Sequence, residues 1–381
     1  MPSPALNIIL RGGPPAWLRA FLPTADAAYG QLPGQNWIKG LGVVPDASLF
    51  SVTRAAPPNL LLPNAAGVYQ SFGANALGRT DLGLTVNRAA TNRYVTTTGN
   101  LLDPASNPGS NVTITPNAGV APDGTNTAFR LQGVSTWAYS QIKNLLGADA
   151  RIDWFVKQYG ATNQTFRLFW NNATSSTDLT ATDTWQRFGF SFVGSSANHG
   201  HGIARDSLNN PADLLVSAPG LFLAIDPAPV VLPAATETTL AASIINVTSA
   251  ALPVAQALFK NGVKVDYISA NAARTVWEAY VDANNFARLY LDTDNRFKLA
   301  ITIGGVAATT IQTAAITAPG TYALSALVTN ALRSLQLDDQ TAVTNSDAIT
   351  LPTWTNFRIG NGQASATPLN GITPYGGWEG V

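Results

Sequence analysis

Cysteine is absent from this chain of 381 residues, and glutamate is scarce, with only Glu237, Glu278 and Glu379. Without cysteine, neither a disulfide framework nor a thiolate metal site is possible, and redox chemistry gives no indication of the compartment. The sequence also lacks a Gly-x-Ser-x-Gly elbow, a phosphate-binding loop and a dinucleotide fingerprint. Common catalytic motifs therefore do not assign a reaction to this protein.

Charge is scarce as well. Charged residues make up 12% of the chain, about half of the usual share of roughly 25%. The 22 basic and 22 acidic residues cancel, which argues against a nucleic-acid partner, because such proteins carry a basic excess. A polar, uncharged surface suits neutral partners such as sugars or other subunits.

Long apolar runs are missing, so we expect no membrane insertion. Residues 1–22 are interrupted by the Arg-Gly-Gly-Pro-Pro stretch at 11–15 and lack the pattern of a signal peptide. The expectation is a soluble, β-rich protein made without a secretion signal. Residues 1–45 form a short apolar arm that differs from the rest, and docking through Trp17, Phe21 and Trp37 is one hypothesis. The alternative is that this arm packs on its own body.

After residue 45, alternation of apolar and polar residues with a period of two is the main pattern in the sequence. Three runs at 277–282, 287–292 and 296–303 alternate apolar and polar residues and are separated by Asp/Asn-rich turns. This pattern predicts an antiparallel three-stranded meander with one wet face, which needs a second apolar layer to form a sandwich. Alternating aromatic runs at 166–170 and 188–192 predict another sandwich upstream. The proline-rich stretch 226–233 between them is interpreted as a linker.

Residues 46–98 resemble a lead-in segment of bacteriophage tail-fibre and related virion proteins. The matching residues are Phe50, Arg54, Gly67-Val68-Tyr69, Asn75, Arg79, Gly83-Leu84 and Arg88-Ala89-Ala90-Thr91-Asn92. Two departures are Ala55-Ala56, where a small hydroxyl residue is usual, and Asn87, where an acidic residue is common. The resemblance implies a structural lead-in to lectin-like β-sandwiches.

Two further stretches resemble known sandwich modules, the first of a kind found in the same virion proteins. Residues 99–230 resemble a jelly-roll carbohydrate-binding module, carried by the stretches 100–102, 121–128, 155–157 and 185–188. Residues 231–381 resemble a laminin-G or concanavalin-like sandwich, carried by 277–282, 288–291, 319–322, 357–360 and 369–371. Only ten residues follow that last Leu-Asn-Gly, so the closing strand is expected to be short, distorted or supplied by a neighbouring chain.

Together these resemblances imply an all-β protein with two consecutive β-sandwich (jelly-roll) domains after an N-terminal docking arm. The expected segments are 1–45, 46–98, 99–230 and 231–381. The implied function is that of a tail-fibre or baseplate-associated virion protein, produced in the host cytoplasm. It would be a homotrimer that binds host surface glycans, with the arm contacting other virion proteins. Two alternatives stay open: a purely structural virion part and a tailspike polysaccharide depolymerase.

Metal ligands are suggested in two places. His199 and His201 lie two residues apart on an expected strand, so their rings share a side and resemble the His-x-His iron sites of trimeric phage spikes. Asp292 and Asp294 have the spacing of calcium ligands but lack the rest of an EF-hand. A glycine-rich loop and a hairpin turn, respectively, explain these residues without a metal, so no cofactor is expected.

Neutral sugars are gripped by exposed rings together with polar side chains. Aromatic residues on the expected outer face or in loop-like contexts are therefore candidates for glycan binding: Tyr280, Tyr290, Trp354, Tyr375 and Trp378. Glycoside hydrolysis would need two carboxylates, and Glu278 with Asp282 on one strand face is the best available pair. The polar face of the meander explains both residues better, so binding without catalysis is expected.

Overall fold

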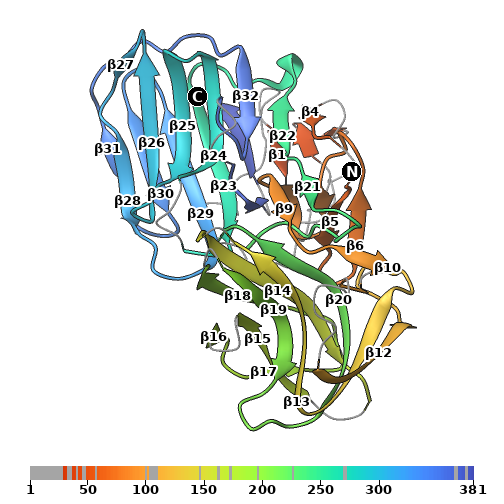
Figure 1. Ribbon diagram of the computed structural model, residues 1–381. Helices are drawn as coiled ribbons and strands as arrows, with labels where there is room; N and C mark the ends of the chain where they lie inside the picture. Colours follow the sequence, from red (N-terminus) through yellow and green to blue (C-terminus); the bar gives the residue numbers. More distant parts are fainter. Residues whose placement is uncertain are drawn as a thin grey trace. The chain divides into compact units, whose positions relative to one another are not determined.

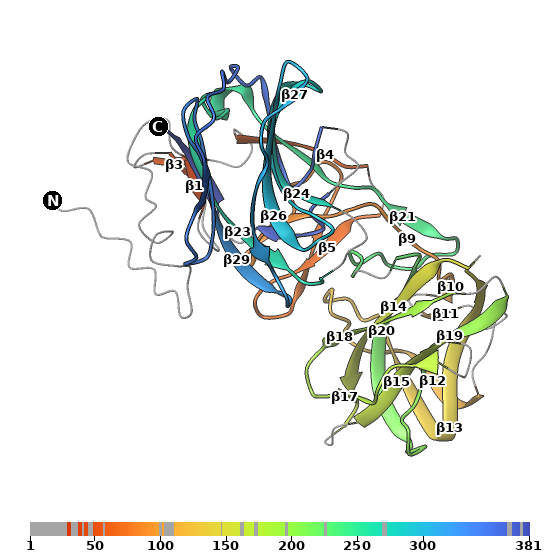
Figure 2. The ribbon, with the colours of Figure 1, turned by 90° about the vertical axis from the view of Figure 1, so that its left-hand side faces the viewer.

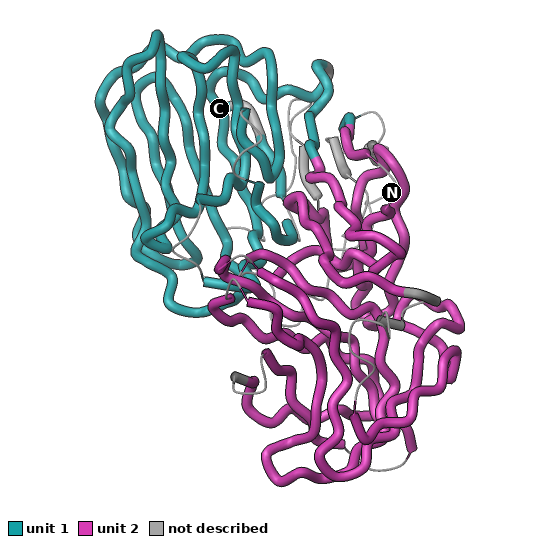
Figure 3. Tube along the Cα trace, in the orientation of Figure 1, with its two compact units in different colours: residues 1–51, 244–381 teal, residues 52–243 magenta. Residues whose placement is uncertain are grey.

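A computed structural model describes residues 29–31, 37–39, 42–44, 49–55, 58–98, 101–102, 110–145, 147–160, 164–170, 174–194, 197–224, 227–268, 273–363, 368–373 and 376–381. Its elements in this described part are strands, apart from one 3-10 turn at Ser249–Ala251 (Figure 1). The expected all-β class is confirmed. The chain forms two units, residues 1–51 with 244–381 and residues 52–243 (Figure 3).

Unit 1 is a sandwich of two antiparallel sheets, seen as separate layers in Figure 2. One sheet contains, in spatial order, β3 (Gly42–Val44), β2 (Trp37–Lys39), β1 (Tyr29–Gln31), β34 (Gly376–Gly380), β23 (Ala257–Val265), β29 (Gly320–Val328), β30 (Arg333–Leu337) and β31 (Val343–Asn345), with β33 (Gly371–Thr373) beside β23. The other contains β27 (Val306–Ala307), β26 (Arg296–Ile303), β25 (Asn285–Leu291), β24 (Arg274–Asp282), β32 (Asn356–Ile359), β22 (Ile244–Val247) and the start of β4 (Phe50–Thr53), with β28 (Ile311–Ala315) beside β26.

The predicted meander is strands β24, β25 and β26, paired in sequence order as expected. Its apolar residues face the second sheet. Trp277 stacks on Phe259 of β23 with ring centroids 4.2 Å apart. The ring centroid of Phe357 of β32 lies 5.7 Å from that of Phe259. Such aromatic contacts across two sheets dominate the stability of a sandwich core.

The closing strand comes from the chain itself. β34 pairs with β23, where Trp378 lies opposite Phe259, and with β1, where Trp378 lies opposite Tyr29. The Trp378 indole N–H donates a 3.1 Å hydrogen bond to the Ala251 carbonyl. The strand is therefore short, as expected, and β1, β2 and β3 extend the sheet beyond it.

The N-terminal arm thus packs in part on its own unit. Trp37 lies in β2, whereas Trp17 and Phe21 fall outside the described residues. A docking role for these three residues stays a prediction.

Unit 2 contains a second sandwich. Its strands are β12 (Ser110–Gly119), β13 (Ala128–Asn144), β14 (Asp149–Gln158), β15 (Gln164–Trp170), β16 (Thr174–Ser175), β17 (Leu179–Ala181), β18 (Gln186–Val193), β19 (Asn198–Arg205) and β20 (Ala212–Phe222), in the order β16-β15-β19-β13-β20-β14-β18. The long strand β13 joins the two layers, because residues 129–133 pair with β20 and residues 138–144 pair with β19. Between these halves Thr136 has a positive φ of 64°, which marks an irregularity that redirects the strand.

The expected boundaries at 98/99 and 230/231 do not separate folding units. Residues 52–98 and 227–243 belong to the same unit as the jelly roll but lie outside its sheet. The further strands of this unit are β5 (Leu60–Pro63), β6 (Tyr69–Phe72), β7 (Arg79–Thr80), β8 (Gly83–Val86), β9 (Ala90–Asn92), β10 (Thr96–Thr98), β11 (Leu101–Leu102) and β21 (Thr238–Leu240). The stretch interpreted as a linker is buried at Ala228, Val230 and Val231. Its apolar residues complete a small core with Leu60 and Leu240, so a free linker there would leave apolar surface in water.

Asn92, in the segment 46–98 expected to be a lead-in, fixes that junction. Its side-chain N–H groups donate to the carbonyls of Pro219 (2.9 Å) and Val231 (2.7 Å). Its side-chain oxygen accepts from the backbone N–H groups of Tyr94 and Leu221, each at 3.1 Å. The buried amide is fully satisfied, which is what a buried polar side chain requires.

Arg54 of the same lead-in is also buried. Its guanidinium donates to the carbonyls of Phe72 (3.0 Å) and Gly73 (2.5 Å) and to the Ser243 hydroxyl (3.1 Å). The buried side chains of Arg54 and Asn92 therefore stabilise unit 2 through hydrogen bonds within it.

Candidate functional site

A cleft of about 530 Å³ lies on unit 2, against the outer face of β15, β19 and the second half of β13. Phe166 and Leu168 of β15 point into the core, so alternation turns Arg167 and Phe169 to the opposite face. The lining residues are Ser110, Ala138, Arg167, Phe169, Ser175, Ala204, Arg205, Asp206, Ser207 and Asn209. Ala138, Phe169 and Ala204 are the apolar residues of this lining and form a small floor. The polar lining residues form the rim.

Strand β19 contributes Ala204 and Arg205 to the lining of the cleft. The small residues Gly200, Gly202 and Ala204 alternate along this strand with the inward-facing His201 and Ile203. A Cβ atom on Gly202 would lie 2.1 Å from the Tyr139 carbonyl oxygen, so glycine is required for the close pairing with β13.

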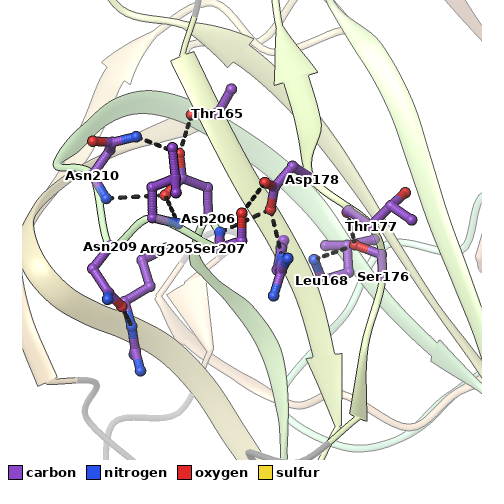
Figure 4. A network of polar contacts seen from close by, with 12 residues as sticks. Thr165, Leu168, Ser176, Thr177, Asp178, Arg205, Asp206, Ser207, Asn209 and Asn210 are labelled. Atoms are coloured by element: carbon purple, nitrogen blue, oxygen red, sulfur yellow. Dashed lines mark hydrogen bonds and ion pairs between the residues drawn. The ribbon is translucent and has the colours of Figure 1, made fainter.

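A tight turn after β19 forms one side of the rim (Figure 4). The Asp206 carboxylate accepts hydrogen bonds from the Thr165 hydroxyl (2.5 Å), the backbone N–H groups of Leu208 and Asn210 (3.0 Å each) and the Asn210 amide (2.8 Å). Burial raises the pKa of Asp206, but these hydrogen bonds lower it by more, so the net shift is downward. The carboxylate is therefore ionised and committed to the turn.

Asp178 forms the opposite corner of the network in Figure 4. It accepts from the Ser207 hydroxyl, from the Ser207 backbone N–H (2.9 Å) and from Arg167 Nε (2.5 Å). The Ser207 hydroxyl is the largest cause of the lowered pKa of Asp178, and the Arg167 guanidinium adds to it. Arg167 is thereby neutralised by a carboxylate partner.

Arg205 is placed differently. Its Nε donates to the Asn209 side-chain oxygen (2.5 Å) and its Nη1 donates a longer bond to the Thr136 carbonyl (3.3 Å). Asn209 itself has a left-handed backbone with φ +60°. Arg205 forms no ion pair with any carboxylate of the described chain. The cleft therefore holds one paired and one unpaired guanidinium.

The aromatic residues predicted for glycan binding lie elsewhere. Trp354, Trp378 and Tyr280 have exposed fractions of 3%, 2% and 7%, so the expectation of exposed rings is wrong for all three. All three rings are buried in unit 1: Trp378 packs edge-on against Phe357, and the Arg358 guanidinium lies 5.5 Å from the centre of the Tyr280 ring. Tyr290 is half-buried, with the Arg288 guanidinium 4.6 Å above its ring. Tyr375 falls outside the described residues.

Glu278 and Asp282 have separate sets of partners. Glu278 is buried opposite Arg288 and Arg358 on the neighbouring strands. Burial raises its pKa, while Arg288, a backbone N–H bond from Gln363 and Arg358 oppose the shift. Asp282 instead accepts hydrogen bonds from the backbone of Asn284 and the side chain of Asn285 in the following turn.

The two histidines share a side of β19, as predicted, but that side faces the core. His201 is fully buried beside Phe192, and neither ring nitrogen has a hydrogen-bond partner among the described residues. Burial and then His199 lower the pKa of His201 to about 4. His199 is half-buried with its ring edge-on to Trp170. A buried His201 is not available to a metal shared between chains, so the His-x-His metal hypothesis is wrong for this side chain.

Asp292 and Asp294 hold an ammonium group. Lys298 Nζ lies 2.7 Å from Asp292 and 2.8 Å from Asp294, in the position that a calcium ion would need. Across the described residues, no group of three or more His, Cys, Asp or Glu side chains has metal-binding geometry. The same part of the chain contains no helix of membrane-crossing length and hydropathy.

Comparison with known proteins gives no family. No family model matches the chain, and no curated protein matches its sequence. Among solved structures, it is similar to the carbohydrate-binding module CBM40 of the Ruminococcus gnavus IT-sialidase bound to α2,3-sialyllactose, with 12% identity, a TM-score of 0.29 and coverage of 33% of this chain and 76% of that one. It is also similar to mouse laminin α1 domains LG4-5, with 7% identity, a TM-score of 0.25 and coverage of 65% and 84%. The fold assignment itself rests on the strand pairing described above.

The cleft residues were not among those predicted from the sequence. The available signal was the alternation of residues 166–170, which places Arg167 and Phe169 on the outer face once Phe166 and Leu168 face inward. No sequence signal indicated that the turn after β19 contributes to the cleft. β19 and β15 are distant along the chain and are brought together only by their pairing.

Proposed function

We propose that this protein is a virion component, part of a phage tail fibre or baseplate, that binds glycans of the host surface for adsorption. The cleft on unit 2 is the observation that carries the proposal. An apolar floor with hydrogen-bonding groups around its edge matches a sugar ring, which has an apolar face and a polar rim. Strands position the floor, and the hydrogen-bonded turn after β19 positions one side of the rim, so little conformational entropy is lost on binding.

The virion assignment is supported by the lead-in resemblance. Arg54 and Asn92, two of the residues that carry it, are buried and hydrogen-bonded inside unit 2. In this proposal the protein is a homotrimer, and residues 1–45 attach it to other virion proteins. These two points rest on the resemblance alone.

We propose binding without cleavage. A glycosidase needs a carboxylic acid that is protonated near neutral pH and a second carboxylate that is free to act. The carboxylates beside the cleft, Asp178 and Asp206, have lowered pKa values and accept three and four hydrogen bonds. Neither has the properties of a general acid.

The test is incubation of the purified full chain with isolated host envelope polysaccharide, following protein retention and the release of new reducing ends. Retention without cleavage is the expected result. The variant Ser175→Trp places a large side chain at the exposed rim of the cleft and should reduce retention at least tenfold. The matched control is Thr344→Trp on the exposed strand β31 of unit 1, which should retain the wild-type value.

Three outcomes would contradict the proposal. Reducing ends released by the wild type would indicate a depolymerase. Absence of both retention and cleavage would favour a purely structural virion part. Equal retention by the two tryptophan variants would place glycan binding away from the cleft.

A further inference from the structure

Resting on the proposed glycan-binding function, we propose that the cleft selects an acidic sugar, whose carboxylate is bound by Arg205. The starting point is the difference between the two guanidinium groups that line the cleft. Arg167 forms an ion pair with Asp178 at 2.5 Å, whereas Arg205 forms no ion pair with a carboxylate of the described residues. Within that part of the chain, the Arg205 guanidinium is therefore bonded only to neutral oxygens.

The hydrogen bonds of Arg205 leave its outer edge available. Nε is bonded to Asn209 and Nη1 makes a 3.3 Å bond to the Thr136 carbonyl, both with neutral oxygens. Guanidinium groups bind carboxylates through two parallel N–H bonds, and they bind them more strongly than neutral hydroxyls. A carboxylate is the ligand group that best completes this arrangement.

The acidic residues nearby do not cancel this preference. The oxygens of Asp206 accept four hydrogen bonds from Thr165, Leu208 and Asn210, so its charge is stabilised by donors of its own turn. Asp178 is engaged by Arg167 and by Ser207. Both carboxylates are thus occupied on the protein side.

Asn209 is the residue that keeps Arg205 unpaired. Its side-chain oxygen holds Nε at 2.5 Å without contributing a charge. Aspartate at this position would present an oxygen at the same place and would convert the hydrogen bond into an ion pair. Asparagine is therefore the positioning residue that orients the guanidinium and leaves its charge for a ligand.

The experiment uses the full chain and a panel of immobilised oligosaccharides that pairs each carboxylate-bearing sugar with its carboxyl-reduced counterpart. The wild type should bind at least one acidic member tenfold or more tightly than its reduced partner, equivalent to at least 1.4 kcal/mol. That preference should shrink as salt is raised from about 0.01 M to 1 M, because the Debye length falls from roughly 30 Å to 3 Å.

The decisive variant is Asn209→Asp, which should lose the preference for the acidic sugar by tenfold or more while keeping its binding to the reduced one. Asn117→Asp is the matched control. Asn117 is exposed in the same unit, has a similar backbone φ of 51° and forms no side-chain bond with the described residues. It adds the same negative charge outside the cleft and should change the preference less than twofold. The melting temperature of each variant establishes that it is folded.

The outcomes separate this inference from the proposed function. Equal binding of acidic and reduced sugars, or equal effects of the two aspartate variants, would overturn the role of Arg205 and leave glycan binding intact. Retention on envelope polysaccharide with no binding to any acidic member would do the same. Failure to bind any sugar, including the envelope polysaccharide, would overturn both.

Discussion

Replacement of His201 by leucine should remove a large part of the acid sensitivity of unit 2. His201 is fully buried, and neither ring nitrogen is hydrogen-bonded. Protonation would place an unpaired charge in the core, and burial accordingly lowers the pKa of His201 from 6.5 to about 4. Between these two values the unfolded chain binds more protons than the folded chain, so stability must fall as the pH falls.

The size of the effect follows from the two pKa values. Stability from this group is complete above pH 6.5 and is lost progressively down to about pH 4. At pH 5 the unfolded histidine is almost fully protonated and the folded one is mostly neutral, which lowers the free energy of unfolding by about 2 kcal/mol relative to pH 8. The limiting loss below pH 4 is about 3 kcal/mol, a substantial share of a typical domain stability of roughly 5–15 kcal/mol.

The assay is urea unfolding followed by tryptophan fluorescence at pH 8 and at pH 5, for the wild type, His201→Leu and His199→Gln. The carboxylates contribute equally in each chain, so the difference between chains isolates the histidine. His201→Leu should lose about 2 kcal/mol less than the wild type over this range. His199→Gln should keep most of the wild-type loss, because burial, the larger cause of the lowered pKa of His201, is retained and only the smaller contribution of His199 is removed.

An equal loss of stability in the wild type and His201→Leu would refute the reasoning. It would mean that the folded core accepts a protonated histidine at little cost. A loss confined to pH values below 4 would point instead to carboxylates as the groups that govern acid unfolding.

Three further predictions concern other parts of the chain. Asn92→Ala should cost about 2–5 kcal/mol, because it removes four buried hydrogen bonds; a thermal melt measures this, and an equal loss in the exposed variant Asn117→Ala would contradict it. Gly202→Val should prevent soluble expression, since its Cβ would collide with a backbone carbonyl of β13; a variant that melts like the wild type would disprove the close pairing. Calcium and chelators should leave the melting temperature unchanged, because Lys298 already occupies the space between its two aspartate partners; a calcium-dependent rise would contradict that assignment.

Alternation in the sequence was sufficient to predict the strands of the meander. Residues 277–303 alternate with a period of two between polar turns, which indicates the side of each strand that faces the core. The expected wet face is wrong for part of β24, where Glu278 and Tyr280 on that side are buried as well. The all-β class and the two sandwiches follow from the same signal. The domain boundaries did not follow from this signal. The composition of residues 227–243 does not distinguish a segment that covers a core from one that joins two domains.

Tertiary structure decided which aromatic residues are available to a ligand. Trp354 and Trp378 lie in segments with the composition of loops, yet both rings are buried. A ring in an irregular segment is exposed or buried according to what folds over it, and this depends on residues far away in the sequence. Alternation contains no information on such contacts.

The sequence by itself determined the class of this protein, the inward and outward faces of its strands and the absence of disulfides. Only the tertiary structure brought Arg167 and Arg205 to one cleft, gave a carboxylate partner to the first and left the second with a neutral asparagine. Periodicity acts within one strand, whereas a site depends on the pairing of strands that are distant along the chain. That pairing is set by long-range packing and hydrogen bonding, so the site became visible only in three dimensions.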